Sequence, residues 1–242
     1  MVNIKCKEKT FSNIKAILFD KNGTLEDSSV DLRNLAQKAA RIIDAQIPGI
    51  GEPLLMAFGV NGNSLDAAGL IAVASRRETE IASAAYIAET GRGWIESLKI
   101  ARESLDEAEK YLGESPSPLF PGSLEILQKF SQAGLKLGIL SAATTQEVNQ
   151  FVKVHQLGEY LDLEMGVDGN IFKPDPTLFL QACEKLGVEA TETLMVGDSV
   201  GDMEMASNAK AAGCIGITWI GKSDHVRGAD VVINKLDEIQ AY

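Results

Sequence analysis

The 242-residue sequence has few cysteines and no long apolar run. Its three cysteines, Cys6, Cys183 and Cys214, are odd in number and widely spaced, which is typical of reduced structural thiols and argues against a disulfide framework or a zinc cluster. Apolar runs such as residues 214–220 are far too short to cross a bilayer. Residues 1–10 carry several charges and no signal-like apolar stretch, so neither a signal peptide nor an anchor is readable. We therefore expect a soluble, cytoplasmic protein.

Basic residues are also scarce, because 23 Lys and Arg face 34 Asp and Glu and leave a net charge of -11. Nucleic acids and anionic membranes both require a basic surface, so neither is expected as a partner. An acidic protein can still bind a phosphate ester if backbone N–H groups, a local cation and a metal ion attract the phosphate. The apolar fraction of 45% is ample for a packed core.

Short apolar runs alternate with segments of helical periodicity over much of the chain. This alternation predicts an α/β fold with a parallel sheet flanked by helices on both faces. The expected strands are residues 16–19, 136–141, 161–165, 193–197, 214–219 and 230–233. The expected helices between them are residues 122–133, 147–156, 175–186 and 203–212.

The alternation is interrupted between residues 29 and 115, where no strand-like run is obvious. Three amphipathic helices are expected there, over residues 32–45, 78–89 and 94–112. The following Gly-Glu-Ser-Pro-Ser-Pro segment has the composition of a linker. We therefore expect an inserted helical domain over residues 29–115 and a core formed by residues 1–28 and 116–242.

Polar residues that could take part in catalysis or binding lie at or just beyond the ends of the predicted strands. In a doubly wound sheet, ligands bind beyond the carboxyl ends of the strands, so these positions are candidates for one site. They are Asp20 after the first strand, Ser141 at the end of the second, Lys173 in a Lys-Pro-Asp-Pro segment, and Asp198 with Asp202 after the strand 193–197.

The segment 20–25, Asp-Lys-Asn-Gly-Thr-Leu, resembles the phosphoaspartate motif Asp-x-Asp-Gly-Thr of haloacid dehalogenase-like (HAD) phosphatases. Ser141, Lys173 and the segment 197–202, Gly-Asp-Ser-Val-Gly-Asp, are similar to the other three motifs of that superfamily, in the same order. Four ordered matches at strand ends make coincidence improbable. The resemblance implies a HAD-like Rossmannoid core with an inserted α-helical cap, as in the phosphoglycolate phosphatase-like branch.

The resemblance also implies a Mg²⁺ site. Asp20, Asp198 and the backbone carbonyl of Asn22 would provide its oxygen ligands, as Mg²⁺ prefers. Asp202 would act through a water molecule or by orienting Lys173.

The same resemblance assigns the phosphate-binding residues. Asp20 would attack phosphorus, and Lys173 would pair with Asp20 and the phosphoryl oxygens. Ser141 and nearby backbone N–H groups would complete the phosphate site. The candidate substrate-binding residues of the core are Gly23, Thr24 and Ala142.

Asn22 departs from the family motif, because it replaces the Asp that protonates the leaving group and then deprotonates water. An amide can do neither, and the loss of general acid–base catalysis typically slows a reaction by about 10²–10⁴-fold. We expect slow hydrolysis, least impaired for leaving groups of low pKa. A phosphomutase would have the same defect. The alternative is a catalytically impaired phosphate-ester binding or regulatory protein with the HAD fold.

The inserted domain provides three candidate substrate contacts, Arg76, Arg77 and Arg92. Arginine binds carboxylate or phosphate through paired donors, although arginines in helical domains also commonly form surface ion pairs. Caps of this family close over the site and exclude water. The expected partner is a small phosphorylated metabolite, phosphoglycolate by resemblance, and the expected state is a monomer or homodimer. Trp94 and Trp219 are expected to serve packing.

Overall fold

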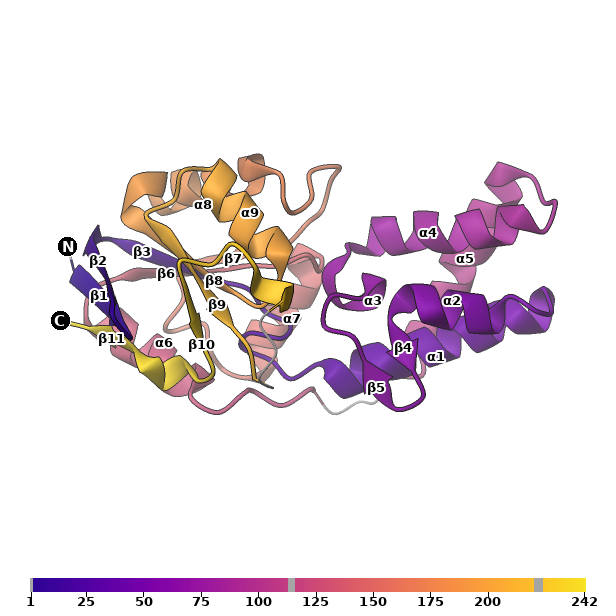
Figure 1. Ribbon diagram of the computed structural model, residues 1–242, viewed down its shortest axis with the longest axis horizontal. Helices are drawn as coiled ribbons and strands as arrows, with labels where there is room; N and C mark the ends of the chain where they lie inside the picture. The colour runs from indigo at the N-terminus through magenta and orange to yellow at the C-terminus, as the bar shows by residue number, and fades with distance from the viewer. Residues whose placement is uncertain (1, 113–115, 220–223) are drawn as a thin grey trace. The chain divides into compact units, whose positions relative to one another are not determined.

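The computed structural model describes residues 2–112, 116–219 and 224–242 (Figure 1). The chain forms two compact units. The larger comprises Met1–Asp27 and Pro118–Tyr242, and the smaller comprises Ser28–Ser117. Across the described ranges, no helix combines the length and apolar character that a membrane crossing needs.

The larger unit contains a parallel six-stranded sheet with the strand order β10-β9-β8-β3-β6-β7. The chain builds outward from β3 on one side and then returns to build on the other, which creates a topological switch point at β3. The α/β class is confirmed. The strands are β3 (Ala16–Phe19), β6 (Lys136–Leu140), β7 (Leu163–Met165), β8 (Thr193–Gly197), β9 (Gly213–Ile217) and β10 (Val231–Ile233).

Helices cover both faces of this sheet, as Figure 1 shows for α8 and α9 on one face and α6 on the other. Successive residues of a strand point to opposite faces, so Ile17 and Phe19 pack with the helices α6 and α7, whereas Ala16 and Leu18 pack with α8 and α9. Both faces are buried, which explains why β3 is a continuous apolar run. The helices are α6 (Ser123–Gln132), α7 (Thr145–Val154), α8 (Pro176–Leu186) and α9 (Val200–Asn208), with single 3₁₀ turns at Ala190–Glu192, Asp224–Val226 and Leu236–Glu238.

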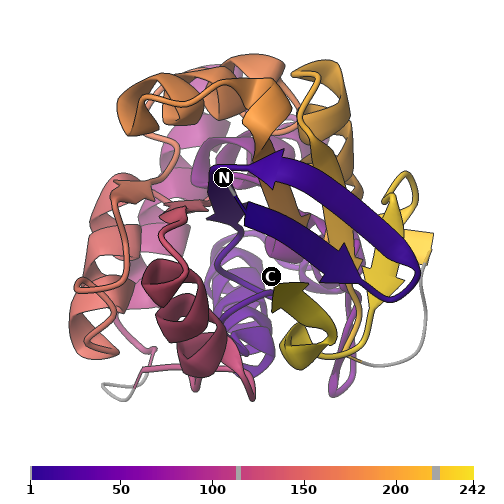
Figure 2. The ribbon, with the colours of Figure 1, turned by 90° about the vertical axis from the view of Figure 1, so that its left-hand side faces the viewer.

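A second, three-stranded antiparallel sheet joins the two ends of the chain, with the order β11-β1-β2 (Figure 2). It consists of β1 (Val2–Cys6), β2 (Lys9–Ile14) and β11 (Ile239–Ala241). No strand was expected at these positions, because β1 and β2 contain isolated apolar residues and no continuous apolar run. Ile4 and Cys6 nevertheless enter the core of the larger unit. All three cysteines of the protein are buried and free.

The smaller unit is mainly helical, with α1 (Ser29–Gln46), α2 (Gly51–Phe58), α3 (Leu70–Val73), α4 (Arg76–Glu89) and α5 (Trp94–Glu109). Its core includes Ala36, Ile43 and Phe58. It also contains one short antiparallel pair, β4 (Val60–Asn61) with β5 (Ser64–Leu65), where no strand was expected. Two residues per strand are too few to produce a periodic signal in the sequence.

Candidate active site

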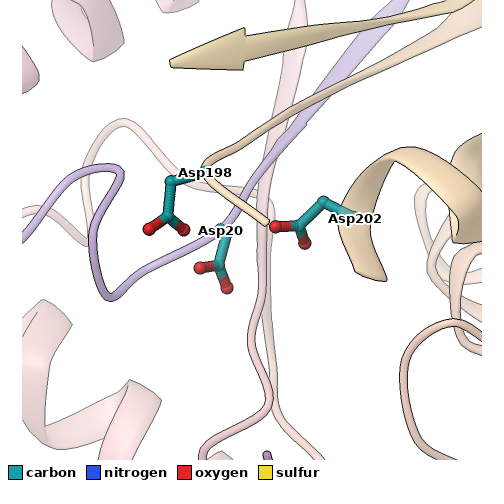
Figure 3. A group of neighbouring side chains, drawn as sticks. All are labelled: Asp20, Asp198 and Asp202. Atoms are coloured by element: carbon teal, nitrogen blue, oxygen red, sulfur yellow. The ribbon is translucent and has the colours of Figure 1, made fainter. Parts of the chain in front are cut away.

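Three carboxylates meet at the carboxyl edge of the parallel sheet (Figure 3). Asp20 follows β3, Asp198 follows the neighbouring strand β8, and Asp202 lies in the first turn of α9. Each offers one oxygen atom, and these atoms lie within 4.8 Å of one another. Strand pairing of β3 with β8 brings the first two together, because parallel neighbours end at the same edge.

Lys173 binds two of these carboxylates. Its Nζ lies 2.7 Å from Asp20 Oδ1 and 2.7 Å from Asp202 Oδ1. Burial alone would lower the pKa of Lys173, but Asp20 and Asp202 together hold it above its ordinary value. The ammonium therefore remains charged in the site.

The carboxyl groups are hard to ionise together. Burial raises the pKa of Asp20 to about 6, although Lys173 opposes that change. Burial, followed by repulsion from Asp20 and Asp202, raises the pKa of Asp198 well above its ordinary value. Lys173 is the one ammonium that the described residues place within ion-pair distance of the cluster. Its single charge leaves an excess of negative charge when all three are ionised, so a divalent cation with a preference for oxygen ligands fits.

Two glycines allow the loops to approach this closely. Gly23 has a φ of +73°, and an added Cβ there would lie 2.0 Å from Asp198 Oδ2. At Gly197, an added Cβ would lie 2.4 Å from Asp202 Cγ. Both distances are far below van der Waals contact, so only glycine leaves room for these carboxylates.

Asp202 is fully buried; its Oδ2 is hydrogen-bonded, and its Oδ1 has no hydrogen bond within the described residues but forms an ion pair with Lys173. Ser199 N–H and Ser199 Oγ donate hydrogen bonds of 3.2 and 2.6 Å to Asp202 Oδ2, and Asp202 N–H donates back to Ser199 Oγ at 3.2 Å. This capping box fixes the start of α9. Because Oδ1 meets Lys173, the arrangement fits an aspartate that orients the lysine.

The other core candidates lie near the same edge or within the motif loop, residues 20–26, which follows β3. Ser141 follows β6, a neighbour of β3, and is buried; its Oγ accepts a hydrogen bond of 3.2 Å from Ala143 N–H. Ala142 lies between these two residues. Thr24 is fully buried, and its hydroxyl has no hydrogen bond to the part of the chain that the structure describes. Phosphate contacts by these residues stay a prediction.

A buried ion pair inside the motif loop was not expected. Lys21 Nζ lies 2.6 Å from Glu26 Oε2 and also donates a 2.5 Å hydrogen bond to Asn22 Oδ1. Both charged side chains are about nine-tenths buried. The sequence signal for this pair is weak, because it consists of two opposite charges five positions apart in a mostly polar segment.

Trp219 was expected to serve packing, but it also binds the motif loop. Its indole N–H donates a 2.9 Å hydrogen bond to the carbonyl of Gly23. The ring stacks on Phe120, with centroids 4.1 Å apart and an interplanar angle of 10°. Trp219 therefore holds the loop that contains Gly23. Trp94, in the smaller unit, is 46% exposed and so contributes less packing than expected.

The three candidate arginines form ion pairs within the smaller unit. Arg76 binds Glu80, Asp106 and Glu109. Arg77 binds Glu80 at 3.1 Å, and Arg92 lies 3.8 Å from Glu96. Their contact with a substrate stays a prediction.

Comparison with known proteins identifies the class. The family model described as haloacid dehalogenase-like hydrolase matches residues 14–210, so the chain belongs to that family. It is 30% identical over 237 residues to a phosphoglycolate phosphatase of Vibrio parahaemolyticus, covering 95% of this chain and 96% of the relative. A phosphoglycolate phosphatase of Aliivibrio fischeri is 32% identical over 210 residues, with coverages of 84% and 83%.

A solved structure supports the fold. The crystal structure of a putative phosphoglycolate phosphatase from Lactobacillus delbrueckii subsp. bulgaricus has a TM-score of 0.67 and 21% identity, covering 93% of this chain and 96% of that one. The expected superfamily, its phosphoglycolate phosphatase-like branch and the class of phosphoric monoester hydrolase are thereby confirmed.

Proposed function

We propose that this protein is a Mg²⁺-dependent phosphatase that hydrolyses a small phosphorylated metabolite through an aspartyl-phosphate on Asp20. The observation that carries the proposal is the position of Asp20, which lies next to Lys173 and within a cluster of three carboxylates at the switch point of the sheet. This arrangement combines a nucleophile with a fixed cation in a chain of the HAD-like hydrolase family.

The metal is proposed to be held by Asp20, Asp198 and the backbone carbonyl of Asn22, with Asp202 acting indirectly. When bound, Mg²⁺ supplies positive charge to the phosphoryl oxygens. The engagement of Asp202 with Ser199 and Lys173 supports its indirect role.

The protein residues then divide the reaction between them. The Asp20 carboxylate forms a bond to phosphorus while the bond from phosphorus to the leaving oxygen breaks. Lys173 offsets the negative charge of Asp20 and of the incoming phosphate, because its ammonium is fixed by Asp202. Ser141, Gly23, Thr24 and Ala142 are proposed to bind the phosphate oxygens.

Asn22 is proposed to slow both steps, since its amide transfers no proton. The same residue favours a second candidate function, a phosphate-ester binding or regulatory protein with little turnover. The hydrogen bond from Lys21 to Asn22 Oδ1 supports this alternative, because it fixes a neutral group where the family has a proton carrier.

Phosphoglycolate is the first metabolite to test, because similar proteins are named for that activity. Location in the cytoplasm and a monomeric or homodimeric state stay predictions. Substrate contacts from Arg76, Arg77 and Arg92 belong to the same proposal.

The decisive experiment compares the native chain with Asn22→Asp in Mg²⁺, using 4-nitrophenyl phosphate and a panel of metabolite phosphates. Asp20→Asn is the control that lacks the nucleophile. The proposal expects turnover by the native chain and a gain of at least about 10²-fold in Asn22→Asp. Inactivity of both, with phosphate binding retained, would favour the binding protein instead.

A further inference from the structure

The Lys21–Glu26 ion pair connects the two ends of the motif loop, in addition to backbone hydrogen bonds within the loop. The carbonyl of Lys21 accepts hydrogen bonds from the backbone N–H groups of Leu25 and Glu26, at 2.9 and 3.0 Å, and Gly23 N–H donates to the carbonyl of Glu26 at 2.9 Å. The side chains of Lys21 and Glu26 then meet at 2.6 Å across this loop. The Lys21 side chain is therefore held at both ends.

The Lys21 ammonium is committed to protein groups. It has three N–H donors. One is directed to Glu26 Oε2 and one to Asn22 Oδ1, while the Phe151 ring lies 5.5 Å from Nζ. The ammonium is thus placed to orient its neighbours rather than to bind substrate.

The orientation of the Asn22 amide follows from this contact. Its Oδ1 is occupied by Lys21, so its NH₂ group points away from the ammonium. Within residues 2–112, 116–219 and 224–242, no hydrogen bond of this NH₂ group to protein is recorded, and Asn22 itself is only partly buried. Two N–H donors are left for a ligand.

The energetics favour a positional role for the ion pair. Removing two charges from water is costly, and a well-packed apolar pair of similar size is often at least as stable. Lys21 and Glu26 also cancel in charge, so together they add no net attraction for phosphate. What the pair does provide is a fixed direction for the amide next to it.

We propose that Lys21 and Glu26 are positioning residues that aim the Asn22 NH₂ group at the leaving oxygen, so that this oxygen departs as a hydrogen-bonded anion. The inference rests on the proposed function and names its substrate class. The site selects phosphate esters with acidic leaving groups, the aryl and acyl phosphates, so an alkyl phosphate such as phosphoglycolate should be a slow substrate. A hydrogen bond stabilises an oxyanion in a water-poor site without transferring a proton.

The step balances without a further reactant. A bond forms between Asp20 and phosphorus, and the bond between phosphorus and the leaving oxygen breaks. The electron pair of that bond stays on the leaving oxygen, which takes its proton later from solvent. Because alkoxides are far more basic than phenolates or carboxylates, the rate depends steeply on the leaving group.

The test measures kcat/KM in Mg²⁺ for a series of ring-substituted phenyl phosphates, because kcat/KM reports the first bond-breaking step. The native chain is compared with Asn22→Asp and with the double variant Lys21→Met/Glu26→Leu, which replaces the ion pair by apolar side chains of similar size. The control is the more exposed ion pair Lys15–Glu192, replaced in the same way by Lys15→Met/Glu192→Leu. This pair has an Nζ to Oε1 distance of 2.7 Å and stands at the opposite, amino ends of β3 and β8.

For each protein, kcat/KM should fall from 4-nitrophenyl phosphate to phenyl phosphate. The fold-decrease should be more than ten times larger in the native chain than in Asn22→Asp. The Lys21→Met/Glu26→Leu variant should lose about 10–10²-fold in kcat/KM on 4-nitrophenyl phosphate, the size expected for a misplaced group, while the control keeps the native value. Circular dichroism and thermal unfolding establish that each variant is folded.

A second readout needs no turnover. The side-chain NH₂ signals of Asn22 in ¹⁵N NMR, assigned by their loss in Asn22→Ala, should shift when inorganic phosphate binds with Mg²⁺. They should shift much less in the Lys21→Met/Glu26→Leu variant. If that folded variant keeps the native rates and phosphate-induced shifts, the positioning role is overturned.

If kcat/KM depends equally on the leaving group in the native chain and in Asn22→Asp, the leaving oxygen does not depart as an anion. The proposed phosphatase function would not be affected by that result. If the proposed function itself is wrong, neither protein will hydrolyse any ester in the series. The two failures are therefore distinguishable from one set of assays.

Discussion

Lys173 Nζ lies 2.7 Å from Asp20 Oδ1, although the two residues are 153 positions apart in the sequence. The same ammonium lies 2.7 Å from Asp202 Oδ1. One buried cation thus holds together the candidate nucleophile and the carboxylate that caps α9. Since the three groups depend on one another, removal of the lysine should affect both activity and stability.

Lys173→Met should lower kcat/KM for 4-nitrophenyl phosphate by at least about 10²-fold, because a fixed charge at the phosphoryl group is lost. It should also destabilise the metal-free protein by about 3–5 kcal/mol, since Asp20 and Asp202 would remain buried without their partner. Steady-state kinetics and urea unfolding measure the two effects. Lys9→Met, which removes a half-exposed ion pair with Asp230, is the control and should change both by little.

Gly23→Ala should prevent metal binding, because the added Cβ would lie 2.0 Å from Asp198 Oδ2. The expected result is loss of the thermal stabilisation by Mg²⁺ that the native protein should show. Gly134→Ala is the matched control, since Gly134 has a similar φ of +79° but no heavy atom within 4 Å of an added Cβ. The control should cost about 1–2 kcal/mol of stability and keep the metal response. An unchanged metal response in Gly23→Ala would contradict this prediction.

The metal-free protein should lose stability relative to Asp198→Asn as the pH rises from about 4 through about 6 and beyond. The pKa of Asp20 is raised to about 6, and that of Asp198 is raised well above its ordinary value. Carboxyl groups with a higher pKa in the folded state bind more protons there, so their stabilising effect exists at low pH and disappears as they ionise. We expect the difference between the two proteins to grow as Asp198 ionises, because the substitution removes this titrating group and leaves Asp20 in place.

Urea unfolding in EDTA across this pH range measures the difference between the two proteins. Mg²⁺ should reverse the loss in the native protein, and more strongly at higher pH, because the metal binds ionised carboxylates. A difference that does not vary with pH would show that the carboxyl cluster is not strained in the folded protein.

Trp219→Phe should weaken the motif loop while keeping the stacking on Phe120. Loss of the 2.9 Å hydrogen bond to the Gly23 carbonyl should cost about 1 kcal/mol of stability and lower kcat/KM about ten-fold. Thermal unfolding and kinetics test the two effects. Trp94→Phe is the control, because Trp94 lies in the smaller unit and is 46% exposed. Equal effects of the two substitutions on stability and kcat/KM would contradict the proposed role of Trp219.

Much of the fold was readable from the sequence because its signals are local. Ala16–Phe19 is apolar at every position, as a strand buried on both faces requires, and Asp20 marks its end. β1 and β2 were missed because neither contains a continuous apolar run, and because β1 pairs with β11, from the other end of the chain. Such a partner leaves no periodic signal in the sequence around β1.

The sequence by itself determined where the parallel strands lie along the chain, the family, and the replacement of a proton carrier by Asn22. Tertiary structure alone decided that Lys173 meets Asp20 and Asp202, that Trp219 binds Gly23, and that Lys21 fixes the Asn22 amide through its pairing with Glu26. The physical reason is that residue types and periodicity act locally. The direction of a buried hydrogen bond depends on how loops from distant strands pack at one edge of the sheet.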